Sequence, residues 1–401
     1  MRTTEAFVGL SCLDCGAHTG ADDIRCPSCG GSLAPTYDES GLETAHESLF
    51  DRDGRLVQTA SDGLARFAPA LPFEADALVG LSEGGTPLLS CPTLTDEWGA
   101  AVQLKAEGAN PTGGLVDREC ALAVTAACEQ DADGVVLPTT GNGGQAAAAY
   151  AARGGLDARC FVPSRSTFDT KAMINVHGGE MDVVGGRYPD AFGAFADSVD
   201  TAGPTHDDDR YSLAPFETPY RHEGAKTLAY ELAGEEPDAV IHPTSHGTGL
   251  VGLSRGFREL AATGVIDQPP QLYAVQPAGC APVVDAWRGD RPDIEPVEHP
   301  DSICGALEVP DPAGGRYALE ALAATGGGAV AVEDDAILDA ALDLADAGVP
   351  VSATGGAAVA AGATLAERGD LDDAETVVLV DPATANRETD LLRSRLMSRG
   401  I

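Results

Sequence analysis

The chain has 401 residues, with 25 Lys and Arg against 63 Asp and Glu, so its formal net charge at pH 7 is −38. Hydrophobic residues make up 43% of the chain, which is enough for a core and excludes a wholly disordered protein. A charge of this size repels nucleic acids and anionic membranes. Because no run of about 18 uncharged apolar residues occurs either, we expect neither nucleic acid nor membrane as a partner.

The basic residues indicate a salt-rich environment. Only Lys105, Lys171 and Lys226 are lysines, and the other basic residues are arginines. Self-repulsion would destabilise a compact fold at low salt, but at about 1 M salt the Debye length is only roughly 3 Å. The composition therefore predicts a halophilic protein. The start Met1–Glu5 has no apolar signal core, which predicts a cytoplasmic location.

The first segment carries four cysteines in two CxxC pairs, Cys12 with Cys15 and Cys26 with Cys29. This spacing is typical of a structural zinc site, and about 40 residues cannot otherwise bury a core. Two local disulfides or four unrelated thiols are the alternatives, and a reducing cytosol disfavours disulfides. His18 lies between the pairs as a substitute ligand or a solvated loop residue. The sequence thus predicts a zinc ribbon over 1–37.

Residues 38–79 are acidic and weakly patterned, and we interpret them as a linker. From residue 80 to 401, short apolar runs alternate with helical patterns. The run 334–342 opens with acidic residues, as helices do, and is followed by a stop at Gly348. Runs of this length separated by helices predict an α/β body with parallel sheets covered on both faces. The expected strands lie near 135–137, 160–162, 239–241, 272–275 and 377–380.

Three glycine-rich turns join an expected strand to a helix, at 138–145, 243–249 and 110–114. Free amides at a helix start favour a phosphate or carboxylate. Any tight turn uses glycine, so each turn alone is weak evidence, and together they favour a small phosphorylated ligand. His242 and His246 belong to the second turn, where a hydrogen bond to backbone is as good an account as a ligand contact. The acidic run 207–209 is interpreted as a solvated loop.

Several motifs resemble one known family. Residues 104–113, Leu-Lys-Ala-Glu-Gly-Ala-Asn-Pro-Thr-Gly, are similar to the start of the active site of threonine synthases and related fold-type II pyridoxal-phosphate (PLP) enzymes, which include tryptophan synthase β. The turn Thr140–Gly144 with its alanine-rich helix, the segment 221–227 and the segment 276–282 also resemble this family. So does the ribbon, which some members carry. The motifs occur in the family's order over nearly the whole chain.

The resemblance implies a two-domain body with PLP between the domains, a smaller subdomain of about 106–225 and a larger one of about 80–105 and 226–401. Asn142 would hydrogen-bond the pyridine hydroxyl, and the residue facing the pyridine nitrogen would fall near Ser352 or Thr354. A homodimer is a family-level expectation. The phosphate would be surrounded by Ser245, His246, Gly247, Thr248 and Gly249.

One position departs from the family. The family's run is Ser-Phe-Lys-Asp-Arg, and its lysine forms the Schiff base with PLP. This chain instead has Gly114-Leu115-Val116-Asp117-Arg118. Covalent capture of an aldehyde needs a primary amine, which valine lacks. Lys105, Lys171 or Lys226 would have to substitute, and packing or ion pairing is the ordinary role for each. Ser245 and Thr248 replace glycines of the family's phosphate turn, and Gly114 replaces a hydroxyl.

These observations lead to three hypotheses. The first is a threonine synthase-like protein that is degenerate or regulatory, a pseudoenzyme without a catalytic residue at position 116, for which PLP is a doubtful cofactor. The second is an active PLP-dependent lyase or synthase, converting O-phosphohomoserine to threonine with a displaced lysine or non-covalent PLP. The third is a phosphate-ester binding module.

Overall fold

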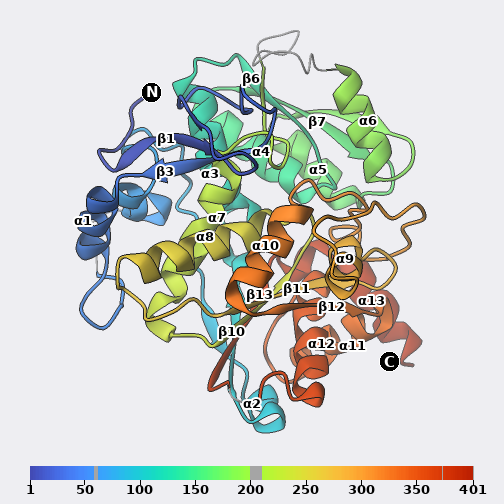
Figure 1. The fold of residues 1–401 in the computed structure, drawn as a ribbon. Helices are drawn as coiled ribbons and strands as arrows, with labels where there is room; N and C mark the ends of the chain where they lie inside the picture. The colour runs from blue at the N-terminus through green and yellow to red at the C-terminus, as the bar shows by residue number, and fades with distance from the viewer. Residues whose placement is uncertain (58–61, 199–209, 373, 401) are drawn as a thin grey trace. The chain divides into compact units, whose positions relative to one another are not determined.

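The computed structural model describes residues 1–57, 62–198, 210–372 and 374–400 (Figure 1). The acidic run 207–209 lies outside these residues. The described chain divides into two compact units. Unit 1 comprises Met1–Gly84, Val116–Gly234 and Glu259–Ile266, and unit 2 comprises Gly85–Leu115, Glu235–Arg258 and Asp267–Ile401. The predicted division into ribbon, linker and body stays a prediction.

Unit 1 contains an antiparallel ribbon sheet and a parallel sheet with its covering helices. Short 3-10 helices are denoted η. The elements are β1 (Phe7–Cys12), β2 (His18–Thr19), β3 (Leu33–Tyr37), α1 (Glu39–Leu49), η1 (Gly63–Ala70), α3 (Val116–Glu129), β6 (Gly134–Pro138), α4 (Asn142–Gly154), β7 (Asp157–Pro163), α5 (Phe168–Val176), β8 (Glu180–Val184), α6 (Tyr188–Ser198), β9 (Arg210–Ser212), α7 (Tyr220–Leu232) and η3 (Ala233–Glu235), which spans the boundary to unit 2.

Unit 2 contains a mostly parallel sheet and its helices. Its elements are β4 (Leu88–Ser90), α2 (Pro92–Trp98), β5 (Ala101–Ala106), η2 (Glu107–Ala109), β10 (Ala239–Pro243), α8 (Thr248–Ala262), β11 (Gln271–Pro277), α9 (Pro282–Arg288), α10 (Gly315–Thr325), β12 (Gly328–Val332), α11 (Asp334–Asp346), α12 (Ala353–Arg368), β13 (Thr376–Asp381), η4 (Ala385–Arg387) and α13 (Thr389–Ser398). Helix α8 begins in unit 2 and ends in unit 1.

The strand order shows a parallel α/β protein. In unit 1 the order is β8-β7-β6-β9, all parallel, and the ribbon has the antiparallel order β2-β1-β3. In unit 2 the order is β12-β11-β10-β13-β5-β4, and only β4 is antiparallel. All five predicted strands and the helix near 334–342 are confirmed. The parallel α/β fold class is confirmed as well.

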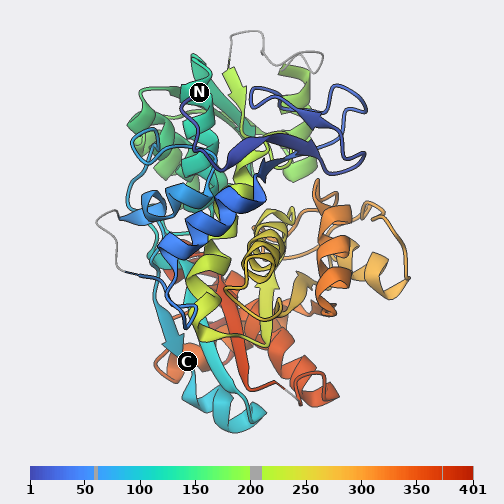
Figure 2. The same ribbon diagram turned by 60° about the vertical axis from the view of Figure 1, so that its left-hand side comes forward.

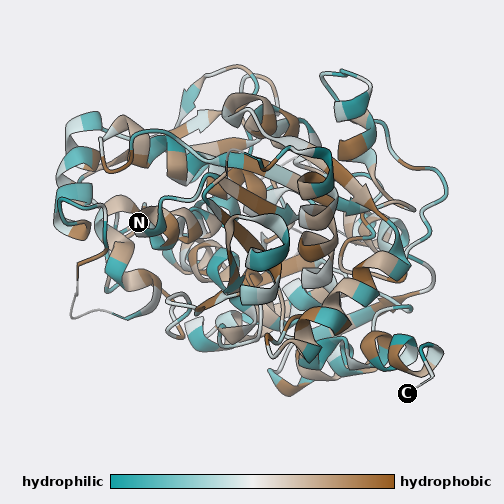
Figure 3. Ribbon diagram, turned by 90° about the horizontal axis from the view of Figure 1, so that it is seen from below, coloured by the Kyte–Doolittle hydropathy of each residue, from teal (hydrophilic) through white to brown (hydrophobic). Residues whose placement is uncertain are grey.

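The sequence accounts for the two-sided burial of these sheets. Strands β6 and β10 are buried at every position, as expected when helices cover both faces. Helix α4 buries its alanine-rich stretch Gly144–Ala151, where small side chains allow close packing on the sheet. In Figure 3 many helices show one brown and one teal face, the pattern of helices that pack on a sheet. Among the described helices, none combines the length and apolar character that spanning a membrane requires.

The segment predicted as a linker contains α1 and η1, which contact each other in unit 1. Helix α1 is capped by Asp38, whose carboxylate accepts a hydrogen bond from the N–H of Gly41. Strand β3 precedes it and lies beside α7 (Figures 1 and 2). The N-terminal segment is therefore an integral part of unit 1.

Candidate metal centre and ligand-binding turns

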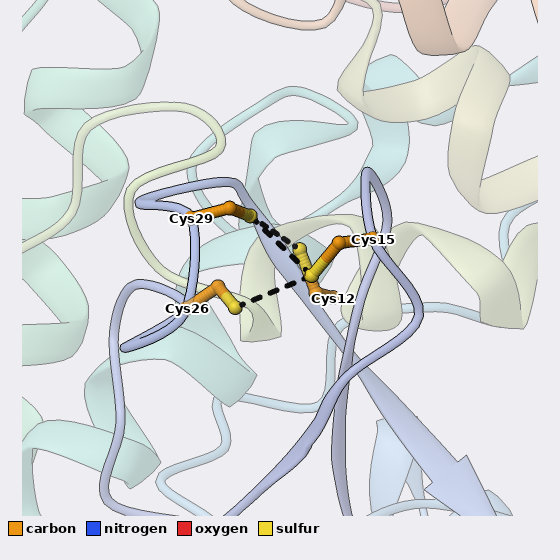
Figure 4. A group of neighbouring side chains, drawn as sticks. All are labelled: Cys12, Cys15, Cys26 and Cys29. Carbon is orange, nitrogen blue, oxygen red and sulfur yellow. Dashed lines mark hydrogen bonds between the residues drawn. The ribbon is translucent and has the colours of Figure 1, made fainter.

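The four cysteines of the predicted ribbon converge (Figure 4). The sulfur atoms of Cys12 and Cys29 lie 3.5 Å apart, those of Cys15 and Cys26 3.7 Å, and those of Cys15 and Cys29 3.4 Å. Four thiolates around a tetrahedral zinc, at about 2.3 Å each, would be about 3.8 Å apart. Burial raises the pKa of Cys26, but backbone N–H groups outweigh it and lower that pKa to about 7. The cluster therefore fits a zinc ion with no open coordination position.

Replacing Cys12 with serine is expected to abolish metal binding at this cluster. Cys12 is buried and supplies one of four thiolates, and a hydroxyl is a poor zinc ligand at neutral pH. Metal analysis should find about one zinc per wild-type chain and almost none in Cys12→Ser. Cys91→Ser is the matched control, since Cys91 is equally buried and lies outside the cluster. Equal zinc content in both variants would contradict the assignment.

Val116 is the first residue of α3, and its side chain is half-buried. Acidic residues in the first turn, Asp117 and Glu119, interact favourably with the positive end of the helix dipole. Arg118 is fully buried, and its guanidinium donates to both carboxylate oxygens of Glu231 at 2.8 and 2.9 Å. Arg221 donates to Glu119 at 2.9 Å. The first turn of α3 is thus held by ion pairs, while position 116 carries an aliphatic side chain.

The three lysines have different surroundings. Lys105 lies on β5, is buried, and donates to the carbonyl of Thr86 at 2.7 Å. Lys226 on α7 is fully buried and pairs with Glu223 and with Glu259, the latter at 2.9 Å. Lys171 on α5 is half-buried. Two of the three ammonium groups are therefore deep inside the units that contain them.

The first predicted anion turn, in unit 1, is closed by its own threonine. The hydroxyl of Thr139 accepts hydrogen bonds from the N–H groups of Gly141 and Gly144, both at 3.0 Å. Gly141 has φ of +133°, a conformation that other residues rarely adopt. Asn142 follows as the first residue of α4 and is half-buried. The turn thus places Asn142 at a helix N-terminus, and its hydrogen bond to a pyridine hydroxyl stays a prediction.

Neighbouring loops of the same sheet edge pack around this turn. The hydroxyl of Ser166, after β7, donates to the carbonyl of Thr140 at 2.7 Å. The hydroxyl of Ser164 accepts from the N–H of Gly186, after β8, at 3.3 Å. Lys171 donates to the carbonyl of Ser164 at 2.8 Å. The carboxyl ends of β6, β7 and β8 therefore form one continuous surface.

Three basic residues follow β7 and β8, in a chain with few cations: Arg165 and Arg187 in loops, and Lys171 on α5. From the sequence, Lys171 is interpreted as a packing or ion-pairing residue or as a relocated amine, and neither arginine carries a signal of its own. Arg165 and Lys171 follow β7, and Arg187 follows β8, so the parallel pairing of these two neighbouring strands brings the three residues to one edge of the sheet. A cationic edge beside a helix N-terminus favours an anionic ligand.

The second predicted anion turn lies in unit 2, between β10 and α8. Thr244 donates its N–H to the carbonyl of Val275 at 2.8 Å, and Gly247 has φ of +91°. The carbonyl of His246 accepts from the N–H of Gly314 at 2.9 Å. Ser245 and His246 are half-buried, and Thr248 begins the helix. The predicted residues 245–249 thus form one turn at a helix start, while Asn142 belongs to unit 1, so a shared ligand stays a prediction.

His242 explains why residue 249 is glycine. A β-carbon at Gly249 would lie 2.5 Å from Nε2 of the buried His242. The hydroxyl of Thr244 donates to the carbonyl of His242 at 2.9 Å and lies 3.3 Å from its Nδ1. Burial lowers the pKa of His242 to about 4, so the ring is neutral at physiological pH. This histidine packs beneath the turn.

Two buried carboxyl groups at the start of α12 were not expected. Asp381, the last residue of β13, accepts a hydrogen bond from the hydroxyl of Ser352 at 2.5 Å. Glu388 accepts from the N–H of Thr354 at 2.8 Å and from its hydroxyl at 2.5 Å. Burial raises the pKa of Asp381 to about 7 and that of Glu388 above its usual value. The hydroxyls predicted to face a pyridine nitrogen are thus both hydrogen-bonded to carboxyl groups.

Asp381 should make stability fall as pH rises from about 4 to about 7. Its pKa of about 7 exceeds its ordinary value of 3.8, so between these values the folded state binds more protons than the unfolded state. The folded state loses this advantage as pH rises, and the difference amounts to a few kcal/mol, about 1.4 per pKa unit. Urea unfolding at pH 5 and pH 8 should show Asp381→Asn gaining stability relative to wild type at the higher pH. Parallel pH profiles for the two proteins would contradict this.

Comparison with known proteins identifies the class. The pyridoxal-phosphate dependent enzyme family matches residues 79–382, so the chain belongs to this family. Within the family it is threonine synthase-like. It is 30% identical over 380 residues to threonine synthase of Methanosarcina acetivorans, covering 92% of this chain and 90% of that protein. It is 31% identical over 390 residues to threonine synthase of Methanocaldococcus jannaschii, covering 94% and 93%.

Solved structures confirm the fold. Threonine deaminase isoform 2 from Solanum lycopersicum matches with a TM-score of 0.66 at 20% identity, over 79% of this chain and 83% of that chain. An L-serine ammonia-lyase from Rhizomucor miehei matches with a TM-score of 0.67 at 21% identity, over 78% and 98%. The predicted fold-type II body is therefore confirmed.

Proposed function

We propose that this protein is a threonine synthase-like ligand-binding protein that does not attach PLP covalently. The observation that carries the proposal is Val116, the first residue of α3, directly before Asp117 and Arg118. These two residues match the family's Asp-Arg and set the register of the first turn. The isopropyl group at position 116 offers neither a nucleophile nor a group that can move a proton.

Some of the residues present fit PLP and others do not. The turn at 245–249 leads into the start of α8, and a helix start favours a phosphate. A covalent bond to the aldehyde of PLP would need a primary amine at position 116, and valine has none. No reaction step through PLP is therefore derived. The turn at 245–249 of unit 2 can bind the phosphate of a small ligand, and within unit 1 Asn142 and the basic residues near it offer polar contacts of their own.

Binding of PLP should accordingly be reversible and depend on its phosphate. In molar KCl, equilibrium dialysis is expected to show binding of PLP that exceeds that of pyridoxal, which has the same ring without the phosphate, by on the order of tenfold or more. Equal binding of both compounds, or of neither, would contradict a phosphate-recognising site. Ser245→Glu, which adds a negative charge to the turn, should reduce the binding of PLP to that of pyridoxal.

An active enzyme with a displaced lysine is the second candidate, and Lys171 is the residue that favours it. Helix α5 packs against the turn that carries Asn142, since a β-carbon at Gly141 would lie 2.5 Å from the Thr170 side chain. Lys171 is the next residue on that helix and is half-buried. If PLP is found joined to the protein, Lys171→Arg should abolish the bond and Lys226→Arg should not.

We also propose that the protein is adapted to high salt. With a net charge of −38, raising KCl from about 0.1 M to about 1 M shortens the Debye length from about 10 Å to about 3 Å and removes most of the repulsion between surface carboxylates. The midpoint of thermal unfolding should therefore rise by several degrees across this range. A constant or falling midpoint would contradict the halophilic interpretation.

A further inference from the structure

The ribbon is attached to α7 by specific polar contacts within unit 1. The hydroxyl of Tyr37, the last residue of β3, donates to the carboxylate of Glu223 at 2.5 Å. The hydroxyl of Tyr220 donates to the carbonyl of Ala21, between the two cysteine pairs, at 2.8 Å. Burial and the neighbouring Glu223 raise the pKa of Tyr37, so its phenol remains a donor. The first turn of α7 is thus held by two different parts of the ribbon.

The same turn of α7 holds the first turn of α3. A β-carbon at Gly224 would overlap the carbonyl of Arg118, so the two helices meet at backbone contact there. Arg221 donates to Glu119 at 2.9 Å, and Arg118 donates to the hydroxyl of Thr227 at 3.1 Å. These side chains are buried. A displacement of α7 therefore cannot leave the first turn of α3 unchanged.

The ribbon itself depends on its metal site. Its strands are short, with six, two and five residues, and it has too few residues to bury a core of its own. Binding of zinc to such a segment supplies folding free energy directly. Without the ion, the loop that contains Ala21 and the end of β3 lose the constraint that positions them against α7.

We infer that the ribbon is a metal-responsive control element: binding of Zn²⁺ at the four cysteines orders α7, and α7 in turn fixes the first turn of α3, where Val116 lies. This element acts on α3 whichever ligand the protein binds. A zinc ion that stabilised only the ribbon would affect only residues 1–37. The proposed coupling also affects α7 and the first turn of α3, two helices outside the ribbon.

Hydrogen–deuterium exchange with mass spectrometry on the full chain tests the inference. Exchange is compared with Zn²⁺ bound and after its removal by a chelator under reducing conditions. We expect removal to speed exchange by about tenfold or more in peptides covering 220–232 and 116–129. Peptides from β7 in unit 1 and β11 in unit 2 should be unaffected. Acceleration confined to residues 1–37 would overturn the inference, and so would acceleration throughout unit 1 including β7.

A variant that keeps the metal but breaks the contact provides the second measurement. Tyr37→Phe retains all four cysteines and the ring, and lacks only the donor to Glu223. It should bind about one zinc and still show faster exchange in α7 and in the first turn of α3. Tyr273→Phe, which removes a hydroxyl that donates to Gln271 in unit 2, is the matched control and should leave both helices unchanged. Wild-type exchange in zinc-loaded Tyr37→Phe would overturn the inference.

Discussion

Val116→Lys is expected to convert the protein into one that binds PLP covalently. The variant should turn yellow with PLP in molar KCl and, after borohydride reduction, carry about one pyridoxyl group per chain on residue 116. The physical reason is that the substitution supplies the primary amine that an aldehyde requires. Lysine is also at least as good a helix former as valine, and the ion pairs of Arg118 and Glu119 leave the first turn of α3 in place.

Val116→Arg is the matched control for this variant. It places a long cationic side chain at the same position but offers no primary amine, so it should be colourless after dialysis. Colour in both variants would show that charge, rather than covalent attachment, causes the absorbance. A Val116→Lys variant that binds PLP but loses it on dialysis after borohydride treatment would contradict the assignment of position 116.

Lys226→Met is expected to cost about 3–5 kcal/mol of stability, the usual cost of breaking a buried ion pair by removing one partner. The ammonium group is fully buried and is surrounded by Glu223, Glu259, the carbonyl of Ala70 at 3.1 Å and the ring of Tyr37 at 4.3 Å. Methionine keeps much of the side-chain volume, so the loss reports the missing charge. Urea unfolding at constant KCl measures it.

The double variant Lys226→Met with Glu223→Gln separates charge from packing. Removing one of the two carboxylates that face the missing cation should restore part of the lost free energy of unfolding. If the double variant is as unstable as the sum of the two single variants, the two residues are not coupled. A loss below about 1 kcal/mol for Lys226→Met would contradict a buried ion pair.

Much of the fold could be predicted because its signals are local. The apolar runs at 135–137 and 239–241 are short, rich in β-branched residues and followed by glycine turns, and the structure contains β6 and β10 there. The two CxxC pairs likewise predicted a cluster whose geometry depends on a few adjacent residues. The structure brings those four sulfur atoms together.

The parts that were not predicted depend on contacts between distant residues. The sequence identifies Arg118 because Asp117-Arg118 matches the family's Asp-Arg. Its ion-pair partner Glu231 lies 113 residues later, on α7, and could not be identified in this way. Asp381 and Glu388 stand out only once the end of β13 is placed beside the start of α12. A single acidic residue carries no distinguishing signal in a chain with 63 of them. Long-range pairing of this kind is set by packing, which local patterns do not encode.

The central claim is most directly tested by mass spectrometry of the wild-type chain after incubation with stoichiometric PLP in molar KCl and reduction with borohydride. We expect an unmodified mass and a colourless solution after dialysis, because residue 116 has no nitrogen to form the bond. A stable adduct that adds one pyridoxyl group at a single lysine would contradict this account and establish a relocated covalent site.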